Sequence, residues 1–166
     1  MFKIDPKVSN ILKEINSFAK ERKASLFLVG GFLRDFVLGR EKRCTDFDFA
    51  VRRNAIPFGR ELANRLKCAF IILDKTHGSC RIVKKVGETA YTFDFTDFRG
   101  KTIEEDLQHR DFTINTFALG LESALDKRYI RENIIDIFDA KRDIKRRIIR
   151  AVSSNSFTED PLRVDR

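Results

Sequence analysis

The feature that most constrains this chain is a buried strand leading into two glycines and a short helix, followed by a second strand with paired carboxylates. Residues 26–29 read LFLV, residues 30–35 read GGFLRD and residues 46–48 read DFD. Residues two apart on a strand point to the same face, so Asp46 and Asp48 share one face while the phenylalanine between them points to the core. Glycines let a backbone approach phosphate closely, and carboxylates suit hard cations. The order therefore predicts a phosphate cradle beside a divalent-metal site, an arrangement suited to nucleotidyl transfer.

The composition indicates one globular domain with an anionic partner. The chain has 166 residues, of which 42% are hydrophobic and 35% charged, enough for a core of its own. It carries 33 Lys and Arg against 25 Asp and Glu, a net charge of +8. Such an excess favours nucleic acid or a nucleotide as partner, although charge alone fits a basic soluble protein equally well.

Several protein classes are disfavoured by what the sequence lacks. Cys44, Cys68 and Cys80 are odd in number and have no CxxC spacing, so they indicate reduced thiols and not a disulfide frame or zinc site. His77 and His109 are the only histidines, which argues against a metal cage built from histidine. The sequence has no apolar run of membrane-spanning length and no signal-peptide pattern, so we expect a cytoplasmic protein with no membrane partner.

Hydrophobic periodicity and capping signals predict an α+β chain. Thr102 and Glu105, three residues apart, have the spacing of a capping box at the start of a helix. Residues 122–134 are polar and predicted to be irregular, and a last helix begins at Thr158, so the chain has the look of a fragment. The predicted helices cover residues 5–23, 31–38, 57–66, 112–119 and 141–152, and the predicted strands cover residues 26–29, 46–51, 69–73, 80–86 and 90–98.

Four motifs follow one another in a specific order. The first two are those at residues 30–35 and 46–48; the third is RDFTIN at 110–115 and the fourth is EDPLR at 159–163. This order resembles the class II (bacterial-type) tRNA nucleotidyltransferases and bacterial poly(A) polymerases, within the polymerase-beta-like superfamily. The resemblance covers nearly the whole chain. It implies an α+β polymerase-beta-like fold, a small mixed sheet flanked by helices, with the catalytic head at residues 1–152 and the start of a helical neck at 153–166.

The resemblance also implies a two-metal site. Asp46 and Asp48 match the carboxylates that hold two Mg²⁺ ions, one activating the primer 3′-hydroxyl and the other binding the triphosphate. A third carboxylate belongs on a later strand, where counting back from the Phe-Arg pair at 98–99 favours Asp94 over Asp97. The alternative is that both are ordinary charges of an edge strand.

Further residues match positions that bind the nucleotide. In the third motif Arg110, Asp111 and Asn115 match the ribose-recognition residues, and a local ion pair at a helix start is the alternative. In the fourth motif Asp160 and Arg163, three apart on a helix, match the pair that reads C and A, whose amino group and ring nitrogen complement a carboxylate and a guanidinium. The alternative there is an acid at a helix start with a local salt bridge. The residues matched to triphosphate binding are Gly30, Gly31, Arg34 and Asp35.

The chain departs from the family pattern at two places. His109 stands where the family usually has a first basic residue before Asp111, which removes a permanent charge. Asp139 and Ala140 stand where a hinge motif commonly has two glycines. We expect this hinge to be stiffer, which would favour a single nucleotide over a C-to-A switch.

The resemblance implies addition of C, A or both, from CTP and ATP, to the 3′ end of tRNA. A bacterial poly(A) polymerase is the alternative within the family, because the head motifs are shared. Two other classes remain: an RNA-binding module that has lost catalysis, against which the intact Asp46 and Asp48 argue, and a nucleotidyltransferase that modifies a small molecule, against which the base-reading motif argues.

Overall fold

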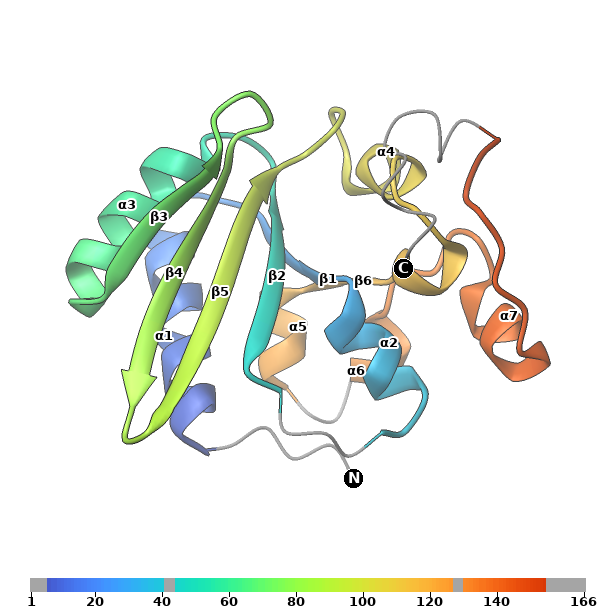
Figure 1. The fold of residues 1–166 in the computed structure, drawn as a ribbon, viewed down its shortest axis with the longest axis horizontal. Helices are drawn as coiled ribbons and strands as arrows, with labels where there is room; N and C mark the ends of the chain where they lie inside the picture. The colour runs from blue at the N-terminus through green and yellow to red at the C-terminus, as the bar shows by residue number, and fades with distance from the viewer. Residues whose placement is uncertain (1–5, 41–43, 127–129, 155–166) are drawn as a thin grey trace.

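A mixed six-stranded sheet with the order β3-β4-β5-β2-β1-β6 organises the molecule (Figure 1). The computed structural model describes residues 6–40, 44–126 and 130–154. Strands β2 and β5 are parallel and every other neighbouring pair is antiparallel, so the predicted α+β fold with a small mixed sheet is confirmed. The strands are β1 (Leu26–Val29), β2 (Asp46–Val51), β3 (Ala69–Asp74), β4 (Ser79–Val86), β5 (Thr89–Asp97) and β6 (Ala118–Gly120).

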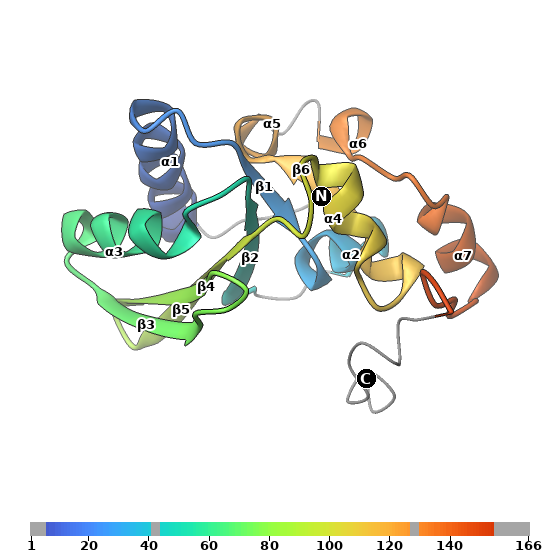
Figure 2. The ribbon, with the colours of Figure 1, turned by 90° about the horizontal axis from the view of Figure 1, so that it is seen from above.

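Helices α1 and α3 lie on the same side of this sheet, and α3 and α7 lie at opposite ends of the molecule (Figures 1 and 2). None of the helices in the described part of the chain has the length and hydropathy that a bilayer crossing requires. The helices are α1 (Pro6–Glu21), α2 (Gly31–Val37), α3 (Ala55–Leu66), α4 (Ile103–Gln108), the 3-10 turn η1 (Thr113–Asn115), α5 (Leu121–Leu125), α6 (Ile130–Asn133) and α7 (Ala140–Arg146).

Aromatic residues fix the register of the two central parallel strands. Phe47 stacks on Phe93 with ring centroids 5.5 Å apart, and Phe49 stacks on Phe95 at 4.9 Å. All four rings are at most 2% exposed. A slip of one residue would move these rings to the opposite face and the carboxylates of β2 into the core. The packing of the core therefore also sets which residues face the other side of the sheet.

Most of the predicted elements before residue 110 are confirmed. Strands β1 and β2 have the predicted bounds. The predicted cap of α4 is present, since the Thr102 hydroxyl accepts a hydrogen bond from the Glu105 N–H at 3.3 Å. Helix α3 begins at Ala55, before the predicted start at Pro57, because its first N–H donates to the Asp97 carboxylate.

The helix predicted at residues 112–119 is wrong. The chain there forms the short turn η1 and then β6, which pairs antiparallel with β1. Phe117, Ala118 and Leu119 are at most 1% exposed, buried at the edge of the sheet. The hydrophobic pattern of so short a run does not distinguish a helix from a strand.

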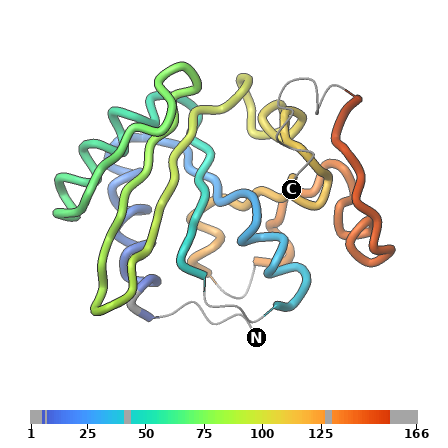
Figure 3. Tube along the Cα trace, in the orientation of Figure 1, coloured from blue at the N-terminus to red at the C-terminus, as the bar shows by residue number. Residues whose placement is uncertain are grey.

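Two further predictions after residue 120 need correction. Residues 122–134 are not wholly irregular, because α5 and α6 occupy parts of that stretch. The helix predicted at 141–152 ends at Arg146, after which Arg147 adopts a left-handed conformation with φ 57°. The chain then turns back (Figure 3). Ala151 pairs with Phe112 in an antiparallel bridge.

The three cysteines all lie within the described residues and are free thiols, as predicted. Burial raises the pKa of Cys44 to about 11 and that of Cys80 to about 12. Both thiols therefore stay protonated at neutral pH and are poor nucleophiles.

Candidate active site

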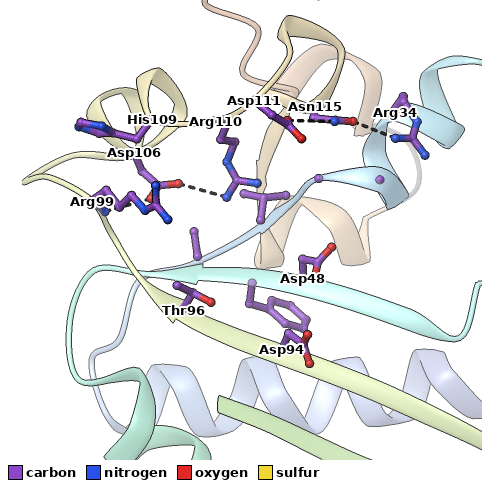
Figure 4. Close-up of a pocket in the computed structure, with 15 residues that line it drawn as sticks. Arg34, Asp48, Asp94, Thr96, Arg99, Asp106, His109, Arg110, Asp111 and Asn115 are labelled. Carbon is purple, nitrogen blue, oxygen red and sulfur yellow. Dashed lines mark hydrogen bonds and ion pairs between the residues drawn. The ribbon is translucent and has the colours of Figure 1, made fainter. Parts of the chain in front are cut away.

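A cavity of about 410 Å³ lies between the sheet and the segment that contains α4 and η1. Carboxylates from β2 and β5 form one wall, and arginine side chains approach from the opposite wall (Figure 4). The lining residues are Val29, Gly30, Gly31, Arg34, Asp48, Phe49, Ala50, Asp94, Thr96, Arg99, Asp106, His109, Arg110, Asp111 and Asn115.

The carboxylate wall follows from the strand register. Asp48 on β2 is the direct partner of Asp94 on β5, and Asp46 is the partner of Thr92. Because Phe47 and Phe93 occupy the buried face, all four of these side chains lie on the pocket face. The Thr92 hydroxyl donates to the Asp46 carboxylate, which also accepts from the Thr45 hydroxyl at 3.0 Å. Asp46 thus lies beside the pocket in a fixed orientation, and Asp48 and Asp94 face into it.

The surroundings of Asp48 disfavour its ionised form. Solvent reaches Asp48 from the pocket, yet burial on its other sides raises the pKa of its carboxyl, and the negative charge of Asp94 raises it further. Arg110 acts in the opposite direction. A partly buried carboxylate beside a second negative charge is a natural site for a cation.

The structure separates the two candidates for the third carboxylate. Asp94 faces the pocket next to Asp48. Asp97 instead accepts the N–H of Ala55 at 2.7 Å and thereby caps α3. The alternative that both are edge-strand charges is wrong, because β5 lies inside the sheet between β4 and β2.

Arg110 is the central cation of the opposite wall. Its Nη2 donates to the Asp106 carboxylate at 3.1 Å, and that carboxylate also accepts the Arg99 N–H at 3.0 Å. The Asp106 side chain is 8% exposed and the Arg110 side chain 25%. Asp106 therefore links the backbone at Arg99 to the Arg110 side chain and directs the guanidinium into the pocket (Figure 4).

A chain of hydrogen bonds links α2 to η1. Arg34 Nη1 donates to Asn115 Oδ1 at 2.8 Å, and Asn115 Nδ2 donates to Asp111 Oδ1 at 3.1 Å. Arg34 Nε also donates to Asp35 at 3.1 Å. Asp35 lies outside the lining residues and supports Arg34, whereas the other residues of this chain line the cavity.

The turn η1 is itself supported from α7. Thr113 donates to the Asp143 carboxylate at 2.8 Å, and Arg150 donates to both oxygens of Asp143 at 3.0 and 3.1 Å. The guanidinium of Arg150 holds the pKa of Asp143 below its usual value, with the Thr113 hydroxyl as second cause. The residues that carry Asp111 and Asn115 are thus braced by the last described elements of the chain.

At the two positions where glycines were expected, Asp139 precedes α7 and Ala140 begins it. Asp139 adopts a left-handed φ of 54°, and Ala140 is fully buried. Asp136 accepts the N–H groups of Ala140 at 2.7 Å and Lys141 at 3.1 Å, which closes the start of the helix. These contacts are consistent with a stiff connection, and its effect on nucleotide choice stays a prediction.

Four polar or charged lining residues had no predicted site role: Thr96, Arg99, Asp106 and His109. One signal was present for Asp106, because it stands four residues before Arg110, a spacing at which opposite charges meet near the end of a helix. Thr96 follows from the alternation of β5 once Asp94 is placed on the pocket face.

The comparisons with known proteins agree with this geometry. The sequence model of the poly A polymerase head domain matches residues 26–150. The chain belongs to the poly A polymerase head domain family. A CC-adding tRNA nucleotidyltransferase of Geobacter sulfurreducens is 36% identical over 152 residues, which cover 92% of this chain and 33% of that protein. One from Synechocystis is 34% identical over 137 residues, which cover 82% of this chain and 30% of that protein.

A solved structure supports the same relationship for the head domain. The Thermotoga maritima CCA-adding enzyme complexed with tRNA matches it with a TM-score of 0.77 and 32% identity, over 97% of this chain and 36% of that chain. The fold is therefore the polymerase-beta-like fold of the CCA-adding enzymes. The chain spans about a third of the length of the curated relatives it matches.

The carboxylates of the head domain suit a divalent cation, although they do not form a closed shell. Among the described residues, no group of three or more His, Cys, Asp or Glu side chains stands close enough to hold a metal ion as placed. Asp48 and Asp94 are nevertheless direct partners on neighbouring strands. Burial and the negative charge of Asp94 both raise the pKa of Asp48, and a cation would offset this penalty on the ionised form. The donor set fits a hard cation such as Mg²⁺.

The fourth motif cannot be placed relative to this pocket. Asp160 and Arg163 lie outside the described residues, so their predicted role in reading the base stays a prediction.

We expect Gly30→Ala to slow nucleotide incorporation by displacing Asp48. Gly30 has φ +73°, and a Cβ there would lie 3.1 Å from Asp48 Oδ2. Gly39, with φ +68° and nothing within 4 Å of its Cβ position, provides the matched control. Both substitutions should lower the free energy of unfolding by roughly 1–2 kcal/mol through backbone strain, but only Gly30→Ala should slow incorporation. Equal incorporation rates in the two variants would contradict the expectation.

Proposed function

We propose that this chain is the catalytic head of a template-independent RNA nucleotidyltransferase, which adds C, A or both from CTP and ATP to the 3′ end of tRNA. The observation that carries the proposal is the pocket in which Asp48 and Asp94 face Arg110 across a cavity. A triphosphate needs cations around its oxygens, and the attacked phosphorus needs carboxylates that position metal. The CC-adding function of the relatives supports the same substrate class.

The mechanism rests on positioning and charge compensation. Two Mg²⁺ ions, held by Asp46 and Asp48 with Asp94 beside them, would activate the primer 3′-hydroxyl and stabilise the pyrophosphate leaving group. The missing side chain of Gly30 leaves room for a phosphate next to Asp48. Arg110, directed by Asp106, compensates negative charge on the triphosphate.

The ribose and base contacts complete the proposed site. Asn115 is held between Arg34 and Asp111, which orients its amide and the Asp111 carboxylate for hydrogen bonds with ribose hydroxyls. Asp160 and Arg163 are proposed to read C and A from the start of the neck, at residues 153–166, while residues 1–152 form the head. We also propose that the protein acts in the cytoplasm, because the relatives named above are tRNA nucleotidyltransferases.

A poly(A) polymerase is the second candidate, because the matching family description is that of the poly A polymerase head domain. A silent RNA-binding module and a small-molecule nucleotidyltransferase are less well supported, since the carboxylate wall is intact and the relatives named above act on tRNA.

The test is incorporation of radiolabelled ATP and CTP, each alone, into tRNA that lacks its 3′ end, in the presence of Mg²⁺. The double variant Asp46→Ala/Asp48→Ala is the control. Metal-dependent incorporation that the double variant loses is the expected result, and the ratio of CTP to ATP distinguishes CC-adding, A-adding and CCA-adding activities. Long A-only products on unrelated RNA would instead support the poly(A) polymerase. If no nucleotide is incorporated, and if RNA binds with an affinity that neither Mg²⁺ nor the double substitution changes, the enzymatic proposal is overturned.

A further inference from the structure

The geometry points to Arg81 as a positioning residue of the active site, which holds the Asp94 carboxylate in one orientation beside Asp48. This inference rests on the proposed function and adds to it a residue that neither the motifs nor the lining of the pocket includes. Arg81 lies on β4, one strand further from the pocket than Asp94.

The sheet register places the residues concerned in one row. Arg81 on β4 is the direct partner of Asp94 on β5, and Asp94 is the direct partner of Asp48 on β2. Direct partners point to the same face of a sheet. The row therefore runs from the guanidinium through one carboxylate to the next, across three neighbouring strands.

The contact between Arg81 and Asp94 has the geometry of a fork on a carboxylate. Arg81 Nε donates to Asp94 Oδ1 at 2.7 Å, and Arg81 Nη2 donates to Asp94 Oδ2 at 2.7 Å. Two parallel hydrogen bonds fix both the position and the plane of a carboxylate, which a single point charge does not do. The Asp94 side chain is 19% exposed and the Arg81 side chain 40%, so the pair is partly shielded from water.

The fork leaves Asp94 able to serve the reaction. Each carboxylate oxygen has two lone pairs, and the fork uses one on each oxygen. The remaining lone pairs stay available for a cation or a substrate hydroxyl at the pocket face. Arg81 also supplies a positive charge next to the row of carboxylates, which lowers their mutual repulsion before any cation binds. Asp46 is held in a similar way by Thr92, so two of the carboxylates are supported by a neighbouring strand.

The experiment compares Arg81→Ala, Arg81→Lys, Asp94→Ala and the double variant Arg81→Ala/Asp94→Ala, with Lys85→Ala as the control. Lys85 lies on the same strand and the same face as Arg81, four residues away, and is exposed. The Lys85→Ala substitution therefore removes an equal charge without changing a partner of Asp94. The readouts are kcat and KM for ATP and CTP, thermal unfolding, and Mn²⁺ affinity measured by electron paramagnetic resonance, which needs no turnover.

We expect Arg81→Ala to lower kcat by about 10–100-fold, the usual effect of losing a partner of a ligating carboxylate, with KM within about twofold of wild type. Arg81→Lys should restore part of kcat, and the double variant should be no slower than Asp94→Ala, because Arg81 acts through Asp94. Mn²⁺ should bind Arg81→Ala at least as tightly as wild type, since a nearby positive charge has gone, and Asp94→Ala more weakly.

Other outcomes overturn the inference. If Arg81→Ala slows the Asp94→Ala chain as much as it slows wild type, Arg81 does not act through Asp94. If Mn²⁺ affinity and thermal stability fall together in Arg81→Ala, its role is structural. Where wild type shows no incorporation, the proposed function fails on its own, and the Mn²⁺ affinities of Arg81→Ala and Asp94→Ala still decide between positioning and a structural role.

Discussion

Asp48→Asn is expected to reduce nucleotide incorporation by about 10³-fold or more, the largest effect of any single substitution in this chain. Asparagine keeps the size of the side chain but removes the charge that, in the proposed mechanism, would hold a divalent cation next to Asp94. The measurement is the single-turnover rate with radiolabelled CTP or ATP. Asp97→Asn is the control, because Asp97 caps α3 and does not face the pocket; it should retain most of the rate. A loss of less than about tenfold in Asp48→Asn would contradict the assigned role.

The same variant should be more stable than wild type when no cation is present. The pKa of Asp48 is raised by burial and by Asp94, so the folded chain holds this proton more tightly than the unfolded chain. The free energy of unfolding is therefore highest below the pKa that Asp48 has in the unfolded chain. It falls as the pH rises through the pKa that Asp48 has in the folded chain. At neutral pH the ionised carboxylate destabilises the fold, and asparagine removes that penalty.

The measurement is thermal unfolding of both proteins in EDTA across acidic to neutral pH. Asp48→Asn should unfold at a higher temperature than wild type at neutral pH, and the difference should disappear at acidic pH, where Asp48 is protonated in both states. Asp97→Asn should unfold at a lower temperature than wild type, because it loses the carboxylate that accepts the Ala55 N–H. A lower unfolding temperature for Asp48→Asn at neutral pH would show that Asp48 is not desolvated or repelled as described.

The carboxylate wall could be predicted from the sequence because its cause is local. The alternation of Phe and Asp in β2 fixes which side chains are buried, and the same alternation recurs in β5 around Asp94. Once two strands must each bury their aromatic residues, their carboxylates meet on the opposite face. The choice of Asp94 over Asp97 came from the resemblance, by counting back from the Phe-Arg pair at 98–99, and the alternation of β5 places Asp94 on the pocket face.

The opposite wall could be predicted only in part, because its causes lie far apart in the sequence. The role of Asp106 depends on the Arg99 N–H and the Arg110 guanidinium at once, and no periodic pattern signals that convergence. The turn η1 depends on Asp143 and Arg150 from beyond residue 140. A segment whose shape is set by such distant partners can have an apolar spacing that resembles a helix, as residues 112–119 do.

Arg110→Ala is expected to cause the second largest loss, because it lowers both the stability of the fold and the affinity of the proposed nucleotide site. Its loss leaves the buried Asp106 carboxylate without its guanidinium, which we expect to lower the free energy of unfolding by about 3 kcal/mol. It also removes the charge-assisted hydrogen bond proposed between Arg110 and phosphate, worth about 1.5–3 kcal/mol, so the Kd for ATP and CTP should rise by roughly 10–100-fold. Urea unfolding and equilibrium nucleotide binding measure the two effects.

The double variant Arg110→Ala/Asp106→Ala separates the two roles of Arg110. Removing the carboxylate as well eliminates the unpaired buried charge, so the double variant should recover part of the stability that Arg110→Ala loses. It should not recover nucleotide affinity, because the cation that faces the cavity is still missing. Arg110→Lys, which keeps the charge but loses the planar guanidinium, should lie between wild type and Arg110→Ala in both measurements. If the double variant bound nucleotide as tightly as wild type, Arg110 would be only a structural partner of Asp106, and the cations for the triphosphate would have to come from Arg34 and Arg99.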